Sequence, residues 1–183
     1  MIIDRSNPWK TLQKRTSFEN DYFTVSERDV LTPAGEPGYY GVIHFKRHAV
    51  GAIPIDDDGN TWLVGQYRYP HDCYEWEIPE GGADPGESPL ECAKRELLEE
   101  TGISAKNWEL LQEMQVSNSV TDEVSTTYVA RGLTFSAASP DGTEQLAIRK
   151  LPLAEAIRLA IDGTIRDSIS VASLLKLHAL GIS

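Results

Sequence analysis

Gly81 to Ile103 reads G-G-A-D-P-G-E-S-P-L-E-C-A-K-R-E-L-L-E-E-T-G-I, a glycine loop that leads into an acidic stretch with helical signals. Ser88 is a good N-cap residue, Pro89 suits the first helical position, and Glu91 completes a capping box three residues after the serine. Gly102 has the residue type that often ends a helix. The stretch therefore predicts a capped helix between residues 88 and 102.

Two faces of this predicted helix differ in chemistry. Leu97 belongs to an apolar stripe that should face a core, because side chains three and four positions apart share a face. A different face gathers the carboxylates of Glu96, Glu99 and Glu100. Like charges repel unless a cation offsets them, and carboxylate oxygens suit Mg²⁺ or Mn²⁺. The alternative is a solvated acidic surface on which Arg95 pairs with its neighbours at i,i+4.

The spacing of the whole stretch resembles the Nudix box, G-x5-E-x7-R-E-U-x-E-E-x-G-U, in which U is aliphatic. Every fixed position is matched, by Gly81, Glu87, Arg95, Glu96, Leu97, Glu99, Glu100, Gly102 and Ile103. At average residue usage, such a match arises by chance at roughly 10⁻⁹ per starting position. The resemblance implies a Mg²⁺-dependent hydrolase that splits the diphosphate linkage of a nucleoside diphosphate joined to another group. It also implies an α/β fold, an α/β/α sandwich with a mixed sheet.

The same resemblance implies a set of metal ligands, with Mg²⁺ as the ion and Mn²⁺ as an alternative. These ligands are the carboxylates of Glu96, Glu99 and Glu100 and the backbone carbonyl of Glu80. Glu87 and Arg95 are expected to hold the ligands in place through bidentate hydrogen bonds, which differs little from a structural ion pair. Gly81 and Gly82 permit a backbone path that other residues disfavour, or they simply form a turn.

Two further segments resemble the Nudix subgroup of ADP-ribose and nucleotide-sugar pyrophosphatases. Gly65–Pro70 (G-Q-Y-R-Y-P) is similar to its Q-Y-R strand, and Glu77–Gly82 (E-I-P-E-G-G) is similar to its E-L-P-A-G-G segment, with Glu80 in place of alanine. The chain departs from the subgroup at Ser117–Glu123, where Asn118 stands in place of the proline of an S-P-G motif. An ADP-hexose or GDP-hexose is therefore as good a substrate prediction as ADP-ribose.

Other candidate substrate contacts lie outside the box. Arg68 can clamp a diphosphate, because a guanidinium fork matches phosphate oxygens, or it can form a structural salt bridge. Glu77 is expected among the substrate contacts through its place in the E-I-P-E-G-G segment. Trp9, Tyr22 and the neighbouring Phe23 can stack on a nucleobase at a dimer interface, with core or interface packing as the alternative.

The general base is expected to be a glutamate beyond the box, as in the subgroup that the chain resembles. Glu144, in a loop that precedes a predicted strand, fits that place, and the alternatives are an exposed loop acid or a metal ligand. Glu123 is a rival for the same role, or a contact to the substrate ribose. Glu99 is the third candidate.

Length and charge narrow the class of protein. A chain of 183 residues, 40% hydrophobic and 25% charged, is long enough for one packed domain and ordinary for a soluble protein. A formal net charge of −11 argues against a nucleic-acid or anionic-membrane partner, because both need basic surfaces. Two cysteines, no apolar leader and no run of membrane-spanning length favour the cytoplasm.

The pattern of strands and helices divides the chain into two parts. Residues 1–45 are predicted to form an N-terminal β extension, a hairpin with strands at 23–31 and 39–45. Residues 46–183 are predicted to form the Nudix hydrolase domain, with strands at 49–55, 62–69, 74–78, 108–116, 124–131 and 146–151 and later helices at 152–162 and 168–180. In similar Nudix enzymes, an N-terminal segment of this kind builds a homodimer.

The prediction is hydrolysis of a nucleoside diphosphate sugar to a nucleoside monophosphate and a sugar phosphate. Among enzymes, the alternative substrate is a dinucleoside polyphosphate or another capped nucleotide. Outside enzymes, the alternative is a catalytically inactive nucleotide sensor. Such a sensor is expected to have lost one of the helix glutamates, and all of them are present.

Overall fold

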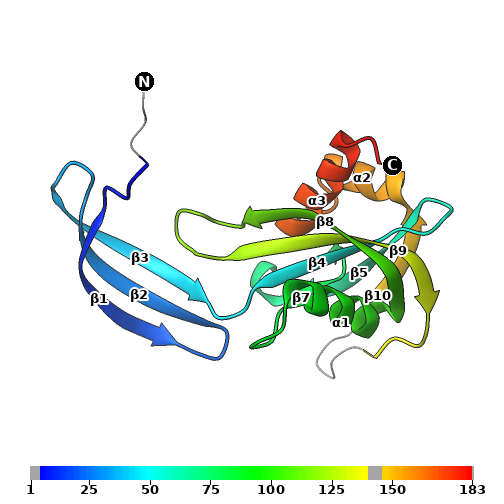
Figure 1. The fold of residues 1–183 in the computed structure, drawn as a ribbon, viewed down its shortest axis with the longest axis horizontal. Coiled ribbons are helices and arrows are strands. Elements are labelled where there is room, and N and C mark those ends of the chain that lie inside the picture. Colours follow the sequence, from blue (N-terminus) through cyan, green and yellow to red (C-terminus); the bar gives the residue numbers. More distant parts are fainter. Residues whose placement is uncertain (1–4, 140–145, 183) are drawn as a thin grey trace. The chain divides into compact units, whose positions relative to one another are not determined.

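The computed structural model describes residues 5–139 and 146–182 (Figure 1). Its contacts separate into two compact units, Met1–Lys46 with Ser117–Glu123, and Arg47–Val116 with Val124–Ser183. The first unit contains one sheet of three strands. The second contains a sheet of three strands, a sheet of four strands and, in the described part of the chain, three α-helices.

The first unit is an antiparallel sheet in the order β1-β2-β3, with bounds β1 (Lys10–Glu19), β2 (Phe23–Leu31) and β3 (Pro37–Phe45). The first turn forms because Asn20 Oδ1 accepts hydrogen bonds from the N–H groups of Tyr22 and Phe23 at 2.9 and 2.8 Å. The predicted hairpin is confirmed as β2 and β3. The sequence pattern does not predict β1, because Leu12 and Phe18 are the only large apolar residues in that strand.

Ser117–Glu123 lies along the free edge of β3. The Ile43 N–H donates to the carbonyl oxygen of Val120 at 2.9 Å, and the Asp122 N–H donates to the carbonyl oxygen of Ile43 at 3.2 Å. The segment that contains Asn118 is therefore paired with the N-terminal sheet.

The second unit has a mixed four-stranded sheet in the order β7-β4-β9-β8, in which β4 and β9 are parallel and the other pairs are antiparallel. Its strands are β7 (Glu80–Gly82), β4 (Ala49–Pro54), β9 (Val124–Phe135) and β8 (Ile103–Gln115). The other sheet is antiparallel, in the order β10-β5-β6, with strands β10 (Ala147–Pro152), β5 (Asn60–Arg68) and β6 (Cys73–Glu77). A short 3₁₀ helix, η1 (Tyr69–His71), joins β5 to β6.

Helices cover both faces of the four-stranded sheet (Figure 1). On one face, α1 (Pro89–Thr101) packs through Leu97 against Ala52 of β4. On the other face, α2 (Leu153–Ile161) and α3 (Ser168–Ala179) pack in one cluster with Ile53 of β4. Successive residues of β4 therefore point to opposite helical layers, as expected for a strand buried on both sides. The predicted α/β sandwich with a mixed sheet is confirmed.

Most predicted elements of the second unit agree with the structure to within two residues at each end. The largest differences are at β8, which begins at Ile103 rather than at residue 108, and at β9, which continues to Phe135. In the described ranges, no helix combines the length and apolarity needed to cross a bilayer.

Candidate active site

Helix α1 has the predicted caps at both ends. The Ser88 hydroxyl accepts a hydrogen bond from the Glu91 N–H at 3.3 Å, and the Glu91 carboxylate accepts one from the Ser88 N–H at 3.0 Å. Gly102 ends the helix in the left-handed region with φ of 72°, and its N–H donates to the carbonyl oxygen of Leu98. Both ends satisfy backbone groups that would otherwise lack partners, which fixes the helix that carries the acidic residues.

Arg95 is the centre of the acidic surface. Its guanidinium binds Glu87 through two nitrogens, Nε at 3.0 Å and Nη2 at 2.9 Å. Its Nη1 donates to Glu96 at 2.7 Å and to Glu99 at 3.1 Å. Its Nη2 also donates to the carbonyl oxygen of Gly82 at 3.2 Å, so one side chain joins the helix to the glycine loop.

The Arg95 network sets the charge of Glu87. Hydrogen bonds from Arg95 lower the pKa of the Glu87 carboxyl from 4.5 to about 2, and a hydrogen bond from the Asp84 N–H acts in the same direction. The same pair raises the pKa of Arg95. Both groups are therefore charged at neutral pH, and both are partly shielded from solvent.

Gly81 lies against the Glu96 carboxylate. Gly81 and Gly82 both belong to β7, and neither is among the glycines with positive φ. This corrects the expectation of an unusual backbone path or a turn. A Cβ built on Gly81 would overlap Oε1 of Glu96, so a side chain at this position would displace the end of that carboxylate.

Glu100 and Glu80 meet between α1 and β7. The Glu80 N–H donates to Oε2 of Glu100 at 3.1 Å, and Glu100 is only 3% exposed. The Glu80 side chain is largely buried, and its Oε2 makes no hydrogen bond to a described residue. Burial raises the pKa of Glu80 well above its usual range, and the carboxylates of Asp167 and Glu77 raise it further.

Arg68 faces Glu77 instead of standing free. Its Nε and Nη2 donate to the two carboxylate oxygens of Glu77 at 3.0 and 2.6 Å, and Gln66 Nε2 adds a third bond at 2.6 Å. Glu77 is almost fully buried, and burial raises its pKa even though Arg68 opposes the shift. Nε and Nη2 of Arg68 are therefore bound to a buried partner, as in the salt-bridge alternative, and Nη2 also lies 3.5 Å from Oε1 of Glu80.

The acidic residues form a donor set that suits a hard divalent cation. Glu96 and Glu100 lie on the inner side of α1, whereas Glu99 is the most exposed of the three, with 45% of its side chain accessible. In residues 5–139 and 146–182, no three acidic, imidazole or thiol groups already converge on one point. The carboxylate chemistry of these three glutamates nevertheless suits Mg²⁺ or Mn²⁺.

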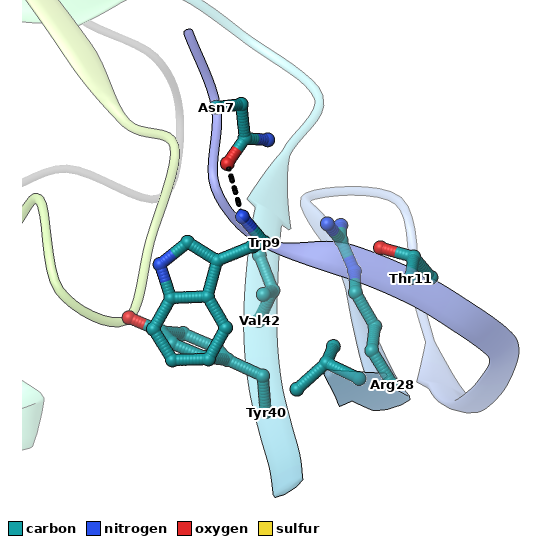
Figure 2. A pocket seen from close by; sticks show the side chains of 7 residues that line it. Asn7, Trp9, Thr11, Arg28, Tyr40 and Val42 are labelled. Carbon is teal, nitrogen blue, oxygen red and sulfur yellow. Dashed lines mark hydrogen bonds between the residues drawn. The ribbon is translucent and has the colours of Figure 1, made fainter. Parts of the chain in front are cut away.

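Among the three aromatic candidates for base stacking, Trp9 is separated from Tyr22 and Phe23 in the N-terminal sheet. Trp9 lines a pocket of about 220 Å³ with Tyr40 and Arg28, and the Trp9 and Tyr40 rings meet edge to face at 5.6 Å (Figure 2). Tyr22 lies beyond the other end of β1, which is ten residues long, or roughly 30 Å. Phe23 packs between Phe18 and Phe45, as in the packing alternative. One subunit therefore cannot bring Trp9 and Tyr22 to the same base.

The structure describes two of the three candidates for the general base. Glu99 lies on α1, where Arg95 binds it. Glu123 belongs to the segment that pairs with the N-terminal sheet. Glu144 lies outside the described residues.

Two residues at the start of α3 that were not predicted as site residues, Asp167 and Ser170, approach the acidic site. Asp167 caps the helix, and its charge raises the pKa of both Glu77 and Glu80. Ser170 accepts a hydrogen bond from the Ile78 N–H at 2.9 Å. An Asp followed by a helical apolar pattern signals a cap, but no sequence pattern shows which loop that cap faces.

Known proteins match this chain over most of its length. The family described as NUDIX domain matches residues 45–172. Over 177 residues, the chain is 33% identical to a protein of Mycobacterium tuberculosis named ADP-ribose pyrophosphatase. The aligned region covers 94% of this chain and 84% of that protein. The chain is 30% identical over 172 residues to ADP compounds hydrolase NudE of Escherichia coli, covering 90% and 92% of the two chains.

A third relative is not named as a hydrolase, and a solved structure shows that the similarity includes the fold. The chain is 32% identical over 169 residues to a Bacillus methanolicus protein named methanol dehydrogenase activator, covering 90% of each. A crystal structure of an ADP compounds hydrolase superposes with a TM-score of 0.86 at 27% identity, and it covers 99% of this chain and 100% of that one.

Proposed function

This chain belongs to the Nudix family and is a Nudix pyrophosphatase, and from that premise we propose that it uses Mg²⁺ to hydrolyse the diphosphate bond of a nucleoside diphosphate sugar. The products are a nucleoside monophosphate and a sugar phosphate. The observation that carries the proposal is the Arg95 network, which holds Glu87, Glu96 and Glu99 together beside the glycine loop.

Each residue of the box has a separate task in this proposal. Glu96, Glu99, Glu100 and the Glu80 carbonyl are the metal ligands. A bound Mg²⁺ supplies charge neutralisation of the diphosphate and lowers the pKa of a water. Arg95 and Glu87 orient the ligands, since groups behind a metal ligand fix its direction and basicity. Arg68, steadied by Glu77, presents the rest of its guanidinium to phosphate oxygens.

The base that takes the proton from water is proposed to be Glu144, by resemblance alone. Changing Glu144 to Gln should lower kcat by about 10² to 10⁴, because that is the usual contribution of a general base. Steady-state rates at saturating substrate and Mg²⁺ measure this. Near-normal kcat in Glu144→Gln, together with a loss in Glu123→Gln, would transfer the role to Glu123. A loss in Glu99→Gln would not decide the matter, because Glu99 is also a proposed metal ligand.

Relatives support an adenosine diphosphate compound as substrate. Names that include ADP-ribose pyrophosphatase and ADP compounds hydrolase belong to proteins that match nearly the whole chain. Asn118 in the S-N-S segment keeps ADP-hexoses and GDP-hexoses as alternatives. This segment pairs with the N-terminal sheet, so we propose that a substitution in it alters substrate preference through that sheet.

The deciding experiment is a substrate panel with product analysis. ADP-ribose, ADP-glucose, GDP-mannose, UDP-glucose and diadenosine polyphosphates are incubated with and without Mg²⁺, and the products are separated. The proposal expects a nucleoside monophosphate and a sugar phosphate, only with Mg²⁺. Turnover of the diadenosine compounds alone would favour the polyphosphate alternative, and binding without turnover would favour a sensor.

We also propose that the protein is a cytoplasmic homodimer built through the N-terminal sheet. Every residue of β1 is exposed, including Leu12 and Phe18 at 55% and 52%, and Tyr22 is 66% exposed beside them in sequence. Exposed apolar side chains gathered on one element are typical of an interaction surface. A mass measurement in solution tests this, and a monomer at micromolar concentration would reject it.

A further inference from the structure

The chain changes sheets immediately before the acidic site. β6 ends at Glu77, which pairs with β5, and β7 begins at Glu80, which pairs with β4. Ile78 lies between the two ladders and is fully buried. A backbone N–H in that position has no water and no ladder partner, so it needs another acceptor.

Ser170 of α3 provides that acceptor. Its Oγ accepts from the Ile78 N–H at 2.9 Å, and Ser170 itself is fully buried. The serine is fixed in turn, because its own N–H donates to the Asp167 carboxylate at 2.7 Å. The bond therefore joins the capped end of α3 to the sheet crossing, 92 positions away in sequence.

Packing and a further hydrogen bond hold the same crossing. A Cβ built on Gly51 would lie 2.8 Å from Cδ1 of Ile78 and 3.4 Å from Cγ2 of Ile169. The Ala52 N–H donates to the carbonyl oxygen of Pro79 at 2.9 Å. Contacts from β4 and from α3 therefore restrict the backbone between Glu77 and Glu80.

The next polar contact along the segment reaches the proposed metal ligands. Two residues after Ile78, the Glu80 N–H donates to the Glu100 carboxylate at 3.1 Å. We propose that Ser170 is a positioning residue of the diphosphate site: it fixes the sheet crossing and thereby the Glu80 carbonyl and the Glu100 carboxylate. This inference rests on the proposed function, because it takes those two groups to be metal ligands.

A second serine on α3 is a matched control. Ser173 is also fully buried, and its Oγ bonds to Thr127 and to Gln112, each at 3.0 Å. Those partners lie on β9 and β8, so the bonds do not involve the crossing. Ser170→Ala and Ser173→Ala each remove one buried hydroxyl from the same helix, α3. Only Ser170→Ala removes the acceptor of the Ile78 N–H.

The test measures Mn²⁺ affinity without substrate, by the electron paramagnetic resonance signal of free Mn²⁺. Ser170→Ala should weaken Mn²⁺ binding by about 10-fold to 100-fold, the usual effect of losing a group that orients a metal ligand. Ser173→Ala should change it by less than about twofold, which is within the scatter expected for an independent site. Amide hydrogen exchange of metal-free protein should show faster exchange at residues 78–80 in Ser170→Ala alone.

Two more variants at position 170 test whether the hydroxyl acceptor itself is needed. Ser170→Thr retains the hydroxyl and should restore Mn²⁺ affinity, whereas Ser170→Cys keeps the volume with a weak acceptor and should not. Equal weakening in the Ser170 and Ser173 variants, or no weakening in either, would overturn the positioning role. Wild-type protein that binds no Mn²⁺ while Ser170→Ala still exchanges faster at 78–80 would instead overturn the proposed function beneath it.

Discussion

The α1 surface and the β1 strand use charged and apolar residues in opposite ways. On α1, charged side chains are partly buried and bound to one another, as in the Arg95 contacts with Glu87 and Glu96. In β1, large apolar side chains are exposed, and no residue of the strand is buried. Each region therefore departs from ordinary burial. We propose that the first binds a cation and that the second binds another copy of the chain.

The largest effect on activity is expected for a substitution in the acidic surface of α1. Glu100→Gln should lower kcat/KM by roughly 10³-fold, or several kcal/mol of transition-state stabilisation, because it removes the charge of a buried metal ligand. Steady-state kinetics across a Mg²⁺ titration measures this. Glu109→Gln, an exposed glutamate on β8, is the control and should behave as wild type. Unchanged activity in Glu100→Gln would remove the metal assignment.

A smaller loss of activity is expected when Arg95, at the centre of the network, is replaced by another positively charged residue. Arg95→Lys should lower activity by about 10-fold to 100-fold, because a single ammonium cannot reproduce the two-nitrogen contact to Glu87 and the bonds to Glu96. Raised Mg²⁺ concentration should recover part of the rate. Full activity at low Mg²⁺ would mean that the network is only a surface ion pair.

Stability as a function of pH separates the Arg95 pair from ordinary surface charges. The folded pKa of Glu87, about 2, lies below its ordinary value of 4.5, so the pair stabilises the fold above pH 4.5. That contribution, roughly 2 kcal/mol for a hydrogen-bonded charge pair, is lost as pH falls from 4.5 toward 2. Urea unfolding of wild type and Glu87→Gln should therefore differ at pH 6 and converge near pH 2. A pH-independent difference would contradict the pairing.

The smallest effect within one chain is expected in β1. Leu12→Glu should change the free energy of unfolding by less than about 0.5 kcal/mol at equal oligomeric state, because Leu12 is 55% exposed. Leu97→Ala, at a fully buried position of α1, should cost about 2–5 kcal/mol. Light scattering should show Leu12→Glu as a monomer and wild type as a dimer. A dimer that survives the change would move the interface away from β1.

The two regions also differ in how far their sequence predicts them. α1 is predicted to within a residue at each end, because Ser88, Glu91 and Gly102 act locally. β1 escapes prediction because its pairing with β2 compensates for a sequence with little β character. Long-range contacts account for the other omissions. Nothing near Ser170 in the sequence indicates Ile78, and nothing near Arg68 indicates that Glu77 occupies its fork.

We propose that the carboxylates of α1 hold a divalent cation beside the glycine loop. Anomalous diffraction from crystals soaked in Mn²⁺ is the most direct test. We expect an ion coordinated by Glu96, Glu100 and the Glu80 carbonyl, at about 2.0–2.3 Å from their oxygens. Acidic side chains that point into solvent with no anomalous peak among them would contradict it.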